Sequence, residues 1–461
     1  MAGGGNEREG SRSSLPGVSQ HDSTDRIVLH VDMDCFYAAC ERRREPLLED
    51  EPVVVGMGYE PGTDSGAVAT ASYEAREFGV ESAQAISAAL SRLPNRERVD
   101  FGDGDIDPDR AETGYYRSVD MEYYQSVSDD VREILRESAD RMREVSIDEA
   151  YLDVTERTAW DAVPTGDSEG EDGGSSDGSS GGRDEGSGER TLAAGFGRHL
   201  RERIAEDVGV TASIGVAPNM SAAKIASDFD KPDGLIVVPP GEVADFLAPL
   251  SIEAVHGVGP VRARELNEMG IETAGDLAGA SPRALADRFG ERGRDLYERA
   301  RGNDDRAVIP KGKPKSLNRE SAFPEATGSA ERWREVVCNL ASEVADRAIE
   351  EGALYRTIGI KVVTPPFEVN TRARSLSGPV QDVDLVKRVA LELLDEFDGA
   401  TIRKLGVRVS NLDFAAADQS NLSNWEATNN GADTRSGSRI DRAIDRSEAS
   451  GQASLTDFDR Q

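Results

Sequence analysis

The chain has 461 residues, enough for about three domains, and carries a net charge of −33 from 87 acidic and 54 basic residues. So acidic a composition argues against a polyanionic partner, because phosphates are bound through a basic surface. Only eight of the basic residues are lysines, however, and an acidic, lysine-poor chain resembles proteins from salt-loving organisms, where a Debye length of about 3 Å at 1 M salt screens long-range repulsion. Charge alone therefore excludes neither a nucleic-acid-binding protein nor an ordinary acidic soluble protein.

Simple counts exclude three further classes of protein. The cysteines Cys35, Cys40 and Cys338 are odd in number and form no CxxC pair, so neither a disulfide framework nor a zinc site is expected. The N-terminal residues include no apolar segment of the kind found in signal peptides. No run of about 18 apolar residues predicts a membrane span. We expect a cytoplasmic protein without membrane contact.

The first half of the chain predicts a domain of strands and helices interrupted by a low-complexity insertion. Residues 1–25 are rich in Gly, Ser and charge and are expected to be disordered. The predicted elements are strands at 26–31, 52–55 and 211–216, a hairpin or strand pair at 146–154, and a helix from Asn219 to Ser227. Residues 161–190 contain nine acidic residues and two arginines among Gly and Ser, which predicts a solvated surface insertion.

The second half predicts a helical region followed by a regular α/β unit. Residues 241–308 read as short helices with Gly-rich turns, and 309–315 read as a linker that contains Lys311, Lys313 and Lys315. A β-α-β-β-α-β order follows, with strands near 316–323, 354–363, 367–376 and 401–410 and helices near 329–351 and 383–396. Residues 416–450 are polar and are expected to be disordered.

Two acidic motifs are candidates for a metal site. Asp32 and Asp34 alternate with apolar residues in 31–37, so on one strand they would share a face. The alternative is that Asp34 only caps a helix beginning at Cys35. In 146–150, Asp148 and Glu149 are adjacent acids in an apolar stretch, which is costly unless they are paired or bound to metal. Together the motifs would place carboxylates from neighbouring strands around a metal pair suited to displacement at phosphorus.

Three further motifs suit phosphate groups. Tyr73 and Arg76 are spaced i, i+3 in 69–76, so on a helix a phenol and a guanidinium would lie together. Lys231 lies in a turn after a helix and is a candidate point charge for a phosphate. The Gly257–Gly259 turn precedes a helix whose free N–H groups suit an anion. Each motif has an ordinary alternative, namely a surface pair, an exposed lysine or a simple turn.

In this order, the motifs at 31–37, 71–76 and 146–151, followed by the Lys231 turn, resemble the palm and fingers of Y-family DNA polymerases of the DNA polymerase IV type. The Gly257–Gly259 turn resembles the helix-hairpin-helix of their thumb, and the β-α-β-β-α-β unit resembles their little finger. The resemblance covers about residues 26–415, and the ordered set is specific although each motif alone is modest. The acidic insertion, His256 in place of a common proline, and both long tails depart from the family pattern.

The resemblance implies an α+β multidomain fold shaped as a right hand. The implied parts are a palm at 26–35 and 101–238, fingers at 36–100, a thumb at 239–308, a linker at 309–315, a little finger at 316–415 and a tail at 416–461. It also implies template-directed, low-fidelity synthesis past damaged bases by a monomer that binds primer–template DNA and deoxynucleoside triphosphates. No acidic constellation for an exonuclease is evident elsewhere, so no proofreading is expected. With the composition, the resemblance points to a halophilic archaeon as the source.

The family's roles carry over to matching positions. Asp32 and Asp148, with the Met33 carbonyl, would hold two Mg²⁺ ions, and Glu149 would be the acidic partner beside them. Asp34 is not a ligand in relatives, so capping is the expected role there. Tyr37 would be the steric gate that excludes a ribose 2′-OH. The implied triphosphate contacts are Thr70, Tyr73, Arg76 and Lys231.

The expected DNA contacts lie in the thumb, the linker and the little finger. They are Gly257, Gly259, Lys311, Lys313, Lys315, Lys361, Arg372 and Arg374. Lys361 should face away from the apolar Ile358, Ile360 and Val362, leaving one sheet face for phosphates, with Arg372 and Arg374 beside it. We therefore expect most of the DNA affinity to reside in 311–410.

The C-terminal peptide 452–459 resembles a motif that binds sliding clamps. Gln452, Leu455 and Phe458 would be its anchors, although Asp459 stands where a second aromatic residue is usual. Leu455 and Phe458 are three residues apart, so one helical turn would place both on one face.

Two other functions stay open at this point. A nucleotidyl cyclase also uses acids on adjacent palm strands, but it would not need the helix-hairpin-helix or the basic linker. A catalytically inactive adaptor for damaged DNA would not need Asp32, Asp148 and Glu149. Primer extension separates the polymerase from both.

Overall fold

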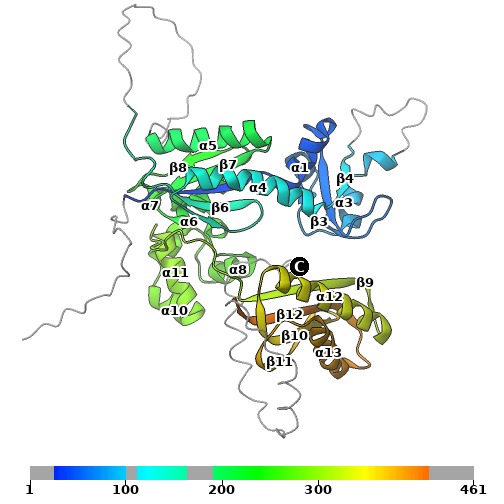
Figure 1. The fold of residues 1–461 in the computed structure, drawn as a ribbon. Coiled ribbons are helices and arrows are strands. Elements are labelled where there is room, and N and C mark those ends of the chain that lie inside the picture. The colour runs from blue at the N-terminus through cyan, green and yellow to red at the C-terminus, as the bar shows by residue number, and fades with distance from the viewer. Residues whose placement is uncertain (1–24, 100–111, 164–190, 415–461) are drawn as a thin grey trace, which may run out of the picture. The chain divides into compact units, whose positions relative to one another are not determined.

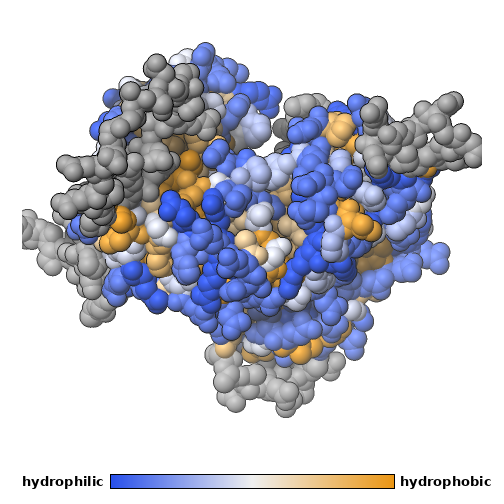
Figure 2. All heavy atoms as spheres, turned by 90° about the horizontal axis from the view of Figure 1, so that it is seen from above, coloured by the Kyte–Doolittle hydropathy of each residue, from blue (hydrophilic) through white to orange (hydrophobic). Residues whose placement is uncertain are grey.

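The computed structural model describes residues 25–99, 112–163 and 191–414, which form two compact units (Figure 1). The first unit ends at Lys311 and the second begins at Gly312, within the predicted linker. Figure 2 shows a face on which hydrophilic residues predominate and hydrophobic residues are exposed in separate small groups, as the charge of the chain leads one to expect. Among the described residues, no helix is long and apolar enough to cross a membrane.

A five-stranded sheet forms the centre of the first unit, in the order β5-β6-β1-β7-β8. Its strands are β1 (Val28–Met33), β5 (Arg141–Glu144), β6 (Glu149–Asp153), β7 (Ala212–Ala217) and β8 (Leu235–Val237). Strand β1 pairs antiparallel with both β6 and β7, so it is the buried middle strand. The hairpin or strand pair predicted at 146–154 is confirmed only in part, because that range holds β6 and the turn before it, whereas the paired strand β5 lies earlier, at Arg141–Glu144.

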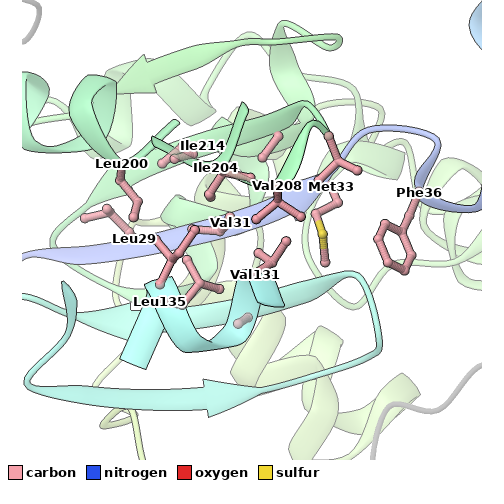
Figure 3. Packing of buried hydrophobic residues seen from close by; sticks show 14 of the residues in the cluster. Leu29, Val31, Met33, Phe36, Val131, Leu135, Leu200, Ile204, Val208 and Ile214 are labelled. Atoms are coloured by element: carbon pink, nitrogen blue, oxygen red, sulfur yellow. The ribbon is translucent and has the colours of Figure 1, made fainter. Parts of the chain in front are cut away.

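Helices cover both faces of this sheet. Leu29, Val31 and Met33 of β1 pack against α4 (Met121–Ser138) and α5 (Leu192–Val208) (Figure 3). The opposite face of β1 packs under α6 (Met220–Phe229), which is capped by the Asn219 side chain. This helix lies so close to the sheet that a Cβ on Gly215 of β7 would meet Ala223 O at 2.0 Å. The alternation of β1 therefore divides its side chains between two differently covered faces.

The first unit also contains a separate three-stranded sheet, in the order β3-β2-β4. The strands are β2 (Val53–Met57), β3 (Ala67–Ala71) and β4 (Tyr115–Ser118). They pack with α1 (Phe36–Arg44), η1 (Pro46–Leu48), α2 (Tyr73–Glu77) and α3 (Ile86–Arg92), whereas η2 (Arg96–Arg98) has no buried residue. The predicted palm segment from residue 101 contains β4, but β4 pairs with β2, so the boundary drawn at residue 100 is wrong and belongs after Ser118.

Short helices complete the first unit, as predicted for 241–308. They are α7 (Val243–Leu247), η5 (Ile252–Ala254), α8 (Pro260–Glu268), α9 (Ala274–Gly279), α10 (Pro282–Phe289) and α11 (Glu291–Ala300). Hydroxyl side chains start two of them: Thr273 forms a capping box with Asp276, and Ser281 caps α10. Their apolar residues share one core with α6.

The second unit is the predicted β-α-β-β-α-β unit. Its elements are β9 (Ser316–Thr327), α12 (Ala330–Glu350), β10 (Leu354–Thr364), β11 (Glu368–Val380), α13 (Val383–Leu394), η6 (Asp395–Phe397) and β12 (Ile402–Asp413). The strands form one antiparallel sheet in the order β11-β10-β12-β9. Both α-helices pack on one face of it, where Ile358, Ile360 and Val362 are buried. The other face is left open within this unit.

Candidate active site

The pairing of β1 with β6 brings the two predicted acidic motifs together. Asp32, near the end of β1, lies directly opposite Glu149, the first residue of β6. Asp148 precedes Glu149 in the turn of the hairpin, and its carbonyl accepts a hydrogen bond of 2.9 Å from the Met33 N–H. The side chains of Asp32 and Glu149 are mostly buried, with 13% and 22% of their surface exposed. Three carboxylates therefore meet at the end of β1, as predicted.

Two lysines balance these carboxylates. Lys224 of α6 places Nζ 2.7 Å from Asp32 Oδ2 and 3.2 Å from Glu149 Oε2. Lys231 Nζ lies 2.8 Å from Asp32 Oδ1, and both ammonium groups also pair with Asp228. Burial disfavours the charged form of Asp32, but the two lysines outweigh it and hold the pKa of Asp32 below its usual value. Two of the eight lysines in the chain thus serve this site.

The three carboxyl groups differ in their tendency to ionise. Burial opposes ionisation of Glu149, yet its contacts with His30 and Lys224 lower its pKa to about 2. Burial raises the pKa of Asp148, and the neighbouring charges of Asp32 and Glu149 add to this, whereas a hydrogen bond of 2.5 Å from Ser146 Oγ opposes it. Asp148 is therefore the carboxylate that gains most from an added cation.

Sequence reasoning missed Lys224 and His30. His30 is fully buried on the same face of β1 as Asp32, with Nδ1 2.8 Å from Ser227 Oγ and Nε2 3.4 Å from Glu149 Oε2. Burial lowers the pKa of His30, so its ring is neutral near pH 7. The signals were available, because His30 stands two residues before Asp32, and Lys224 is a charged residue within the apolar helix at 219–227.

The residues present fit a divalent metal ion. Asp32, Asp148 and Glu149 supply carboxylate oxygens, which are the ligands that hard cations take. Ligand atoms of His30, Asp32 and Glu149 lie within 4.8 Å of one another, a set that includes a nitrogen and differs from the predicted pair Asp32 and Asp148. Burial of so many acids is costly without cations, which the lysines supply in part.

Asp34 does not cap a helix, so that prediction is wrong. Helix α1 begins at Phe36, and its N-cap is Cys35, whose backbone is left-handed (φ 43°) and whose side chain makes no capping hydrogen bond. Strand β1 ends at Met33, so Asp34 also leaves the alternation that would have placed it beside Asp32. Its carboxylate is buried and accepts hydrogen bonds from Tyr73, Ser213 and the Asp233 N–H instead.

Tyr37 lies on the first turn of α1 and stacks on Tyr124 of α4. The two ring centroids are 4.7 Å apart and the ring planes differ by 18°. The Tyr124 hydroxyl donates a hydrogen bond of 2.6 Å to the buried Glu41, which fixes that ring. Burial raises the pKa of Tyr37, and the charge of Asp148 adds to this, which indicates that Tyr37 lies close to the acids.

Of the four residues predicted to contact phosphates, only Tyr73 and Arg76 lie in direct contact with each other. The guanidinium carbon of Arg76 lies 4.8 Å above the ring of Tyr73, in agreement with their i, i+3 spacing on α2. Arg76 is exposed and donates a hydrogen bond of 3.0 Å to Ala71 O, whereas Thr70 is half-buried on β3 opposite Val55. Lys231 is connected to Tyr73 through Asp34, which accepts hydrogen bonds from Tyr73 and from the turn that carries Lys231.

The Gly257–Gly259 turn leads into α8 as predicted. Gly257 has φ 96°, and a Cβ there would meet the Arg299 guanidinium at 3.0 Å, so this position favours glycine. Gly259 is the N-cap of α8, Pro260 follows it, and the helix has no side-chain cap. The first N–H groups of α8 are thus not used by a capping side chain.

In the second unit, Lys361 lies on the open face of the sheet, opposite to the buried Ile360. Its ammonium pairs with Glu320 at 3.3 Å, and Lys404 pairs with the same carboxylate at 2.5 Å. The strand register adds small and hydroxyl residues to this face, namely Ser316, Thr357, Gly359, Thr371, Ala373, Ser375, Gly406 and Ser410, together with Arg408.

Arg372 and Arg374 do not lie beside Lys361, so that part of the prediction is wrong. They pair across the strands with the buried Ile360 and Ile358, which places them on the helix-covered face. Arg372 binds Glu396 at 2.7 Å and Arg374 binds Glu392 of α13. Strand β11 is at the edge of the sheet, which lets these arginines stay exposed despite facing the helices.

The remaining predicted contacts are exposed or not described. Lys311, Lys313 and Lys315 are exposed, and Lys313 Nζ lies 4.6 Å from the ring centre of Phe414. Gln452, Leu455 and Phe458 lie outside the described residues, as does nearly all of the insertion at 161–190.

Three family models match the chain. The impB/mucB/samB family matches residues 31–228, its C-terminal domain matches 314–423, and the HHH motif of this family matches 240–271. The chain is 57% identical over 417 residues to a DNA polymerase IV of Halobacterium salinarum, covering 90% of this chain and 92% of the relative. It is 36% identical over 398 residues to a DNA polymerase IV of Methanoculleus marisnigri, covering 86% and 97%.

Solved structures agree with the sequence relatives. A Y-family DNA polymerase chimera of Dbh and Dpo4 matches with a TM-score of 0.66 at 27% identity, covering 84% of this chain and 99% of that one. An insertion ternary complex of Dbh DNA polymerase matches with a TM-score of 0.54 at 26% identity, with the same coverage. Ordered motifs, paired acids and these relatives together show that the chain belongs to the Y family of DNA polymerases, of the DNA polymerase IV type.

Proposed function

We propose that this translesion DNA polymerase adds deoxynucleotides to a primer 3′ end with two Mg²⁺ ions held by Asp32, Asp148 and the Met33 carbonyl, with Glu149 beside them. Dependence on a divalent metal is a property that the enzyme shares with its family. It acts as a monomer in the cytoplasm, on primer–template DNA and deoxynucleoside triphosphates. The observation that carries the proposal is the register of β1 and β6, which brings Asp32 opposite Glu149 and next to Asp148.

The chain's own residues would bind and orient the substrates. When bound, the metal ions would stabilise the attacking and leaving oxygens of an in-line displacement at phosphorus. Lys231, Tyr73 and Arg76 would contact the triphosphate, with Thr70 behind them on β3, and the Tyr37 ring would lie under the sugar. A nucleotide close to these groups would exclude water from acids that are already mostly buried.

Primer extension tests the metal requirement. With an undamaged and an abasic template in high KCl, we expect incorporation that EDTA abolishes and that rises with about the second power of subsaturating Mg²⁺, as two required ions demand. A first-power dependence would contradict the two-ion proposal. Tight binding of primer–template without any incorporation would instead favour the inactive adaptor.

We further propose that the open face of the second unit binds the DNA backbone, with Lys361, Lys404 and Arg408 as its cations. Glycine, alanine, serine and threonine around them leave room for a phosphate chain. Because Glu320 already pairs with both lysines, DNA phosphates would displace a carboxylate rather than water from them.

Removal of these lysines should weaken DNA binding and its dependence on salt. We expect Lys361→Ala/Lys404→Ala to lower the slope of log affinity against log KCl by about 2, one for each lost phosphate contact. Glu320→Gln should tighten binding. Fluorescence anisotropy with a labelled primer–template checks both. The matched control is Arg372→Ala/Arg374→Ala, which removes two cations from the helix-covered face, and an equal loss with this pair would contradict the assignment.

The tail supplies a further proposal, a sliding clamp bound through Gln452, Leu455 and Phe458. The two apolar residues suit one groove, and hydrophobic binding tolerates high salt. With the clamp present, the intact chain should extend primers more processively than Leu455→Ala/Phe458→Ala, whereas without it the two should behave alike. An equal gain in both proteins would show that the motif is a chance match.

A further inference from the structure

Asp34 is a buried carboxylate that the proposed mechanism does not use. Only 3% of its surface is exposed. Its Oδ1 accepts hydrogen bonds from Ser213 Oγ at 2.8 Å and from Tyr73 Oη at 3.2 Å, and its Oδ2 accepts one from the Asp233 N–H at 2.9 Å. Its own N–H donates to Thr211 O at 2.9 Å, which fixes the backbone at this point. A buried charge held by three donors is a costly feature to keep without a purpose.

The three donors come from three separate elements. Tyr73 begins α2, Ser213 lies in β7, and Asp233 lies in the turn between α6 and β8. The same turn carries Lys231, two residues before Asp233. Asp34 therefore contacts Tyr73, a proposed triphosphate-binding residue, directly. It also holds the backbone of the turn that carries Lys231, the second such residue.

The turn that carries Lys231 has a conformation that needs support. Asp233 is left-handed, with φ 53°, which is an uncommon conformation for a residue with a side chain. A Cβ on Gly234 would meet Asp230 O at 2.0 Å, so the turn closes tightly on itself. Asp34 accepts from the Asp233 N–H, and Ser213 Oγ accepts from the Gly234 N–H at 3.2 Å. These two side chains hold the turn against the end of β1.

The position of Lys231 relative to the metal ligands follows from this support. Its ammonium reaches Asp32, two residues before Asp34, while its turn is tied to Asp34 itself. The segment from Asp32 to Asp34 thus supplies the carboxylate that the Lys231 ammonium contacts and also the carboxylate that anchors the Lys231 turn. A shift of the turn would move the ammonium without moving the carboxylates.

We propose that Asp34 is a positioning residue for nucleotide binding, which sets the Lys231 turn for the triphosphate without touching nucleotide or metal. This rests on the proposed triphosphate role of Lys231. The Tyr73 hydroxyl has one hydrogen, so it cannot donate to Asp34 and to a phosphate at the same time. Asp34 therefore has two opposite effects on nucleotide binding: it positions Lys231, and it competes with the phosphate for the Tyr73 hydroxyl. The effect through Lys231 is the larger, because it sets the position of a full positive charge.

The isosteric change Asp34→Asn tests the proposal. The amide oxygen can still accept from the Asp233 N–H, and the hydroxyls of Ser213 and Tyr73 can turn to accept from the NH₂, so the change removes the negative charge that strengthens these hydrogen bonds. We expect KM for the nucleotide to rise on the order of tenfold with a smaller change in kcat, as for loss of a charge-assisted hydrogen bond. The affinity for nucleotide on a dideoxy-terminated primer, where no chemistry follows, should fall by the same factor.

A double-mutant cycle separates positioning from a general loss of structure. In the Lys231→Ala background, Asp34→Asn should raise KM little further, whereas in the Tyr73→Phe background it should keep most of its effect. Additive effects with Lys231→Ala would overturn the inference. If Lys231→Ala itself leaves KM unchanged, it is the triphosphate role of Lys231 that fails. The matched control is Asp304→Asn, a buried carboxylate that accepts from the Ser221 N–H far along the chain, which should lower the melting temperature but not change KM.

Ser213→Ala gives a second test if Asp34→Asn is too unstable for kinetics. It removes the acceptor of the Gly234 N–H and one donor to Asp34. KM should rise in the same direction by a smaller factor. An unchanged KM in a folded Ser213→Ala protein would overturn the inference.

Discussion

Replacing Asp148 by alanine is expected to reduce nucleotide incorporation by at least about a thousandfold, because loss of this proposed metal ligand would remove several kcal/mol of charge stabilisation from the transition state. Burial and the charges of Asp32 and Glu149 raise the pKa of Asp148, so this carboxyl is the one most dependent on an added cation. Affinity for primer–template should change little, since the proposed backbone contacts lie in the second unit. Single-nucleotide incorporation with Mg²⁺ and DNA binding by anisotropy check the two parts.

Asp153→Ala is the matched control for this variant. Asp153 lies at the other end of β6, where its carboxylate accepts hydrogen bonds from the backbone and the hydroxyl of Thr155. Its loss should lower stability without lowering the rate of incorporation in the folded protein. Asp32→Ala should behave like Asp148→Ala. Near-normal incorporation by either metal-site variant would show that the ligands lie elsewhere.

Replacing Tyr37 by alanine is expected to lower the preference for deoxyribonucleotides over ribonucleotides on the order of 100-fold. Tyr37 is held by stacking on Tyr124, whose own hydroxyl is bound by the buried Glu41, so the ring has little freedom to give way to a 2′-OH. Alanine has only a methyl group at this position, so the ring that blocks the 2′-OH is absent. The measurement is the ratio of incorporation efficiencies for matched deoxy- and ribonucleotides.

Tyr37→Phe is the control for the gate. It keeps the ring and its stacking and removes only the hydroxyl, so the ratio should stay close to that of the unaltered enzyme. If Tyr37→Ala leaves the ratio unchanged, another residue excludes the ribose. If Tyr37→Phe relaxes it as much as Tyr37→Ala, the hydroxyl and not the ring is the selective group.

Patterns confined to one strand or helix were predicted well from the sequence. The helix predicted near 329–351 is α12, and its Trp333, Leu340 and Val344 are buried in the core of the second unit. The apolar residues of 26–31 predicted the buried strand β1. The expectation that Asp32 and Glu149 meet also held, because antiparallel pairing of two short strands fixes which residues are opposite.

Features that depend on where an element ends, or on a distant partner, were not predicted. Asp34 left the face of Asp32 because β1 ends one residue earlier and Cys35 turns the chain with a left-handed conformation. Lys224 was not singled out although it is a charged residue in an apolar helix, because its partners Asp32 and Glu149 are far away in the sequence. Arg372 reached the opposite face from Lys361 because the register of β10 and β11, and not residue type, decides that.

The contacts that assemble the site connect residues made at very different times. Asp32 is 192 residues from Lys224, and Asp34 is 199 residues from Asp233. At a synthesis rate of about 5–20 residues per second, the last of these partners is made roughly 10–40 s after the acids of β1. During that interval the carboxylates have neither their lysines nor the turn that anchors Asp34. A growing chain that has not yet reached residue 224 therefore carries the acids of β1 and β6 without Lys224, Lys231 or the turn that anchors Asp34, so the site is incomplete until the end of α6 and the turn after it have been made.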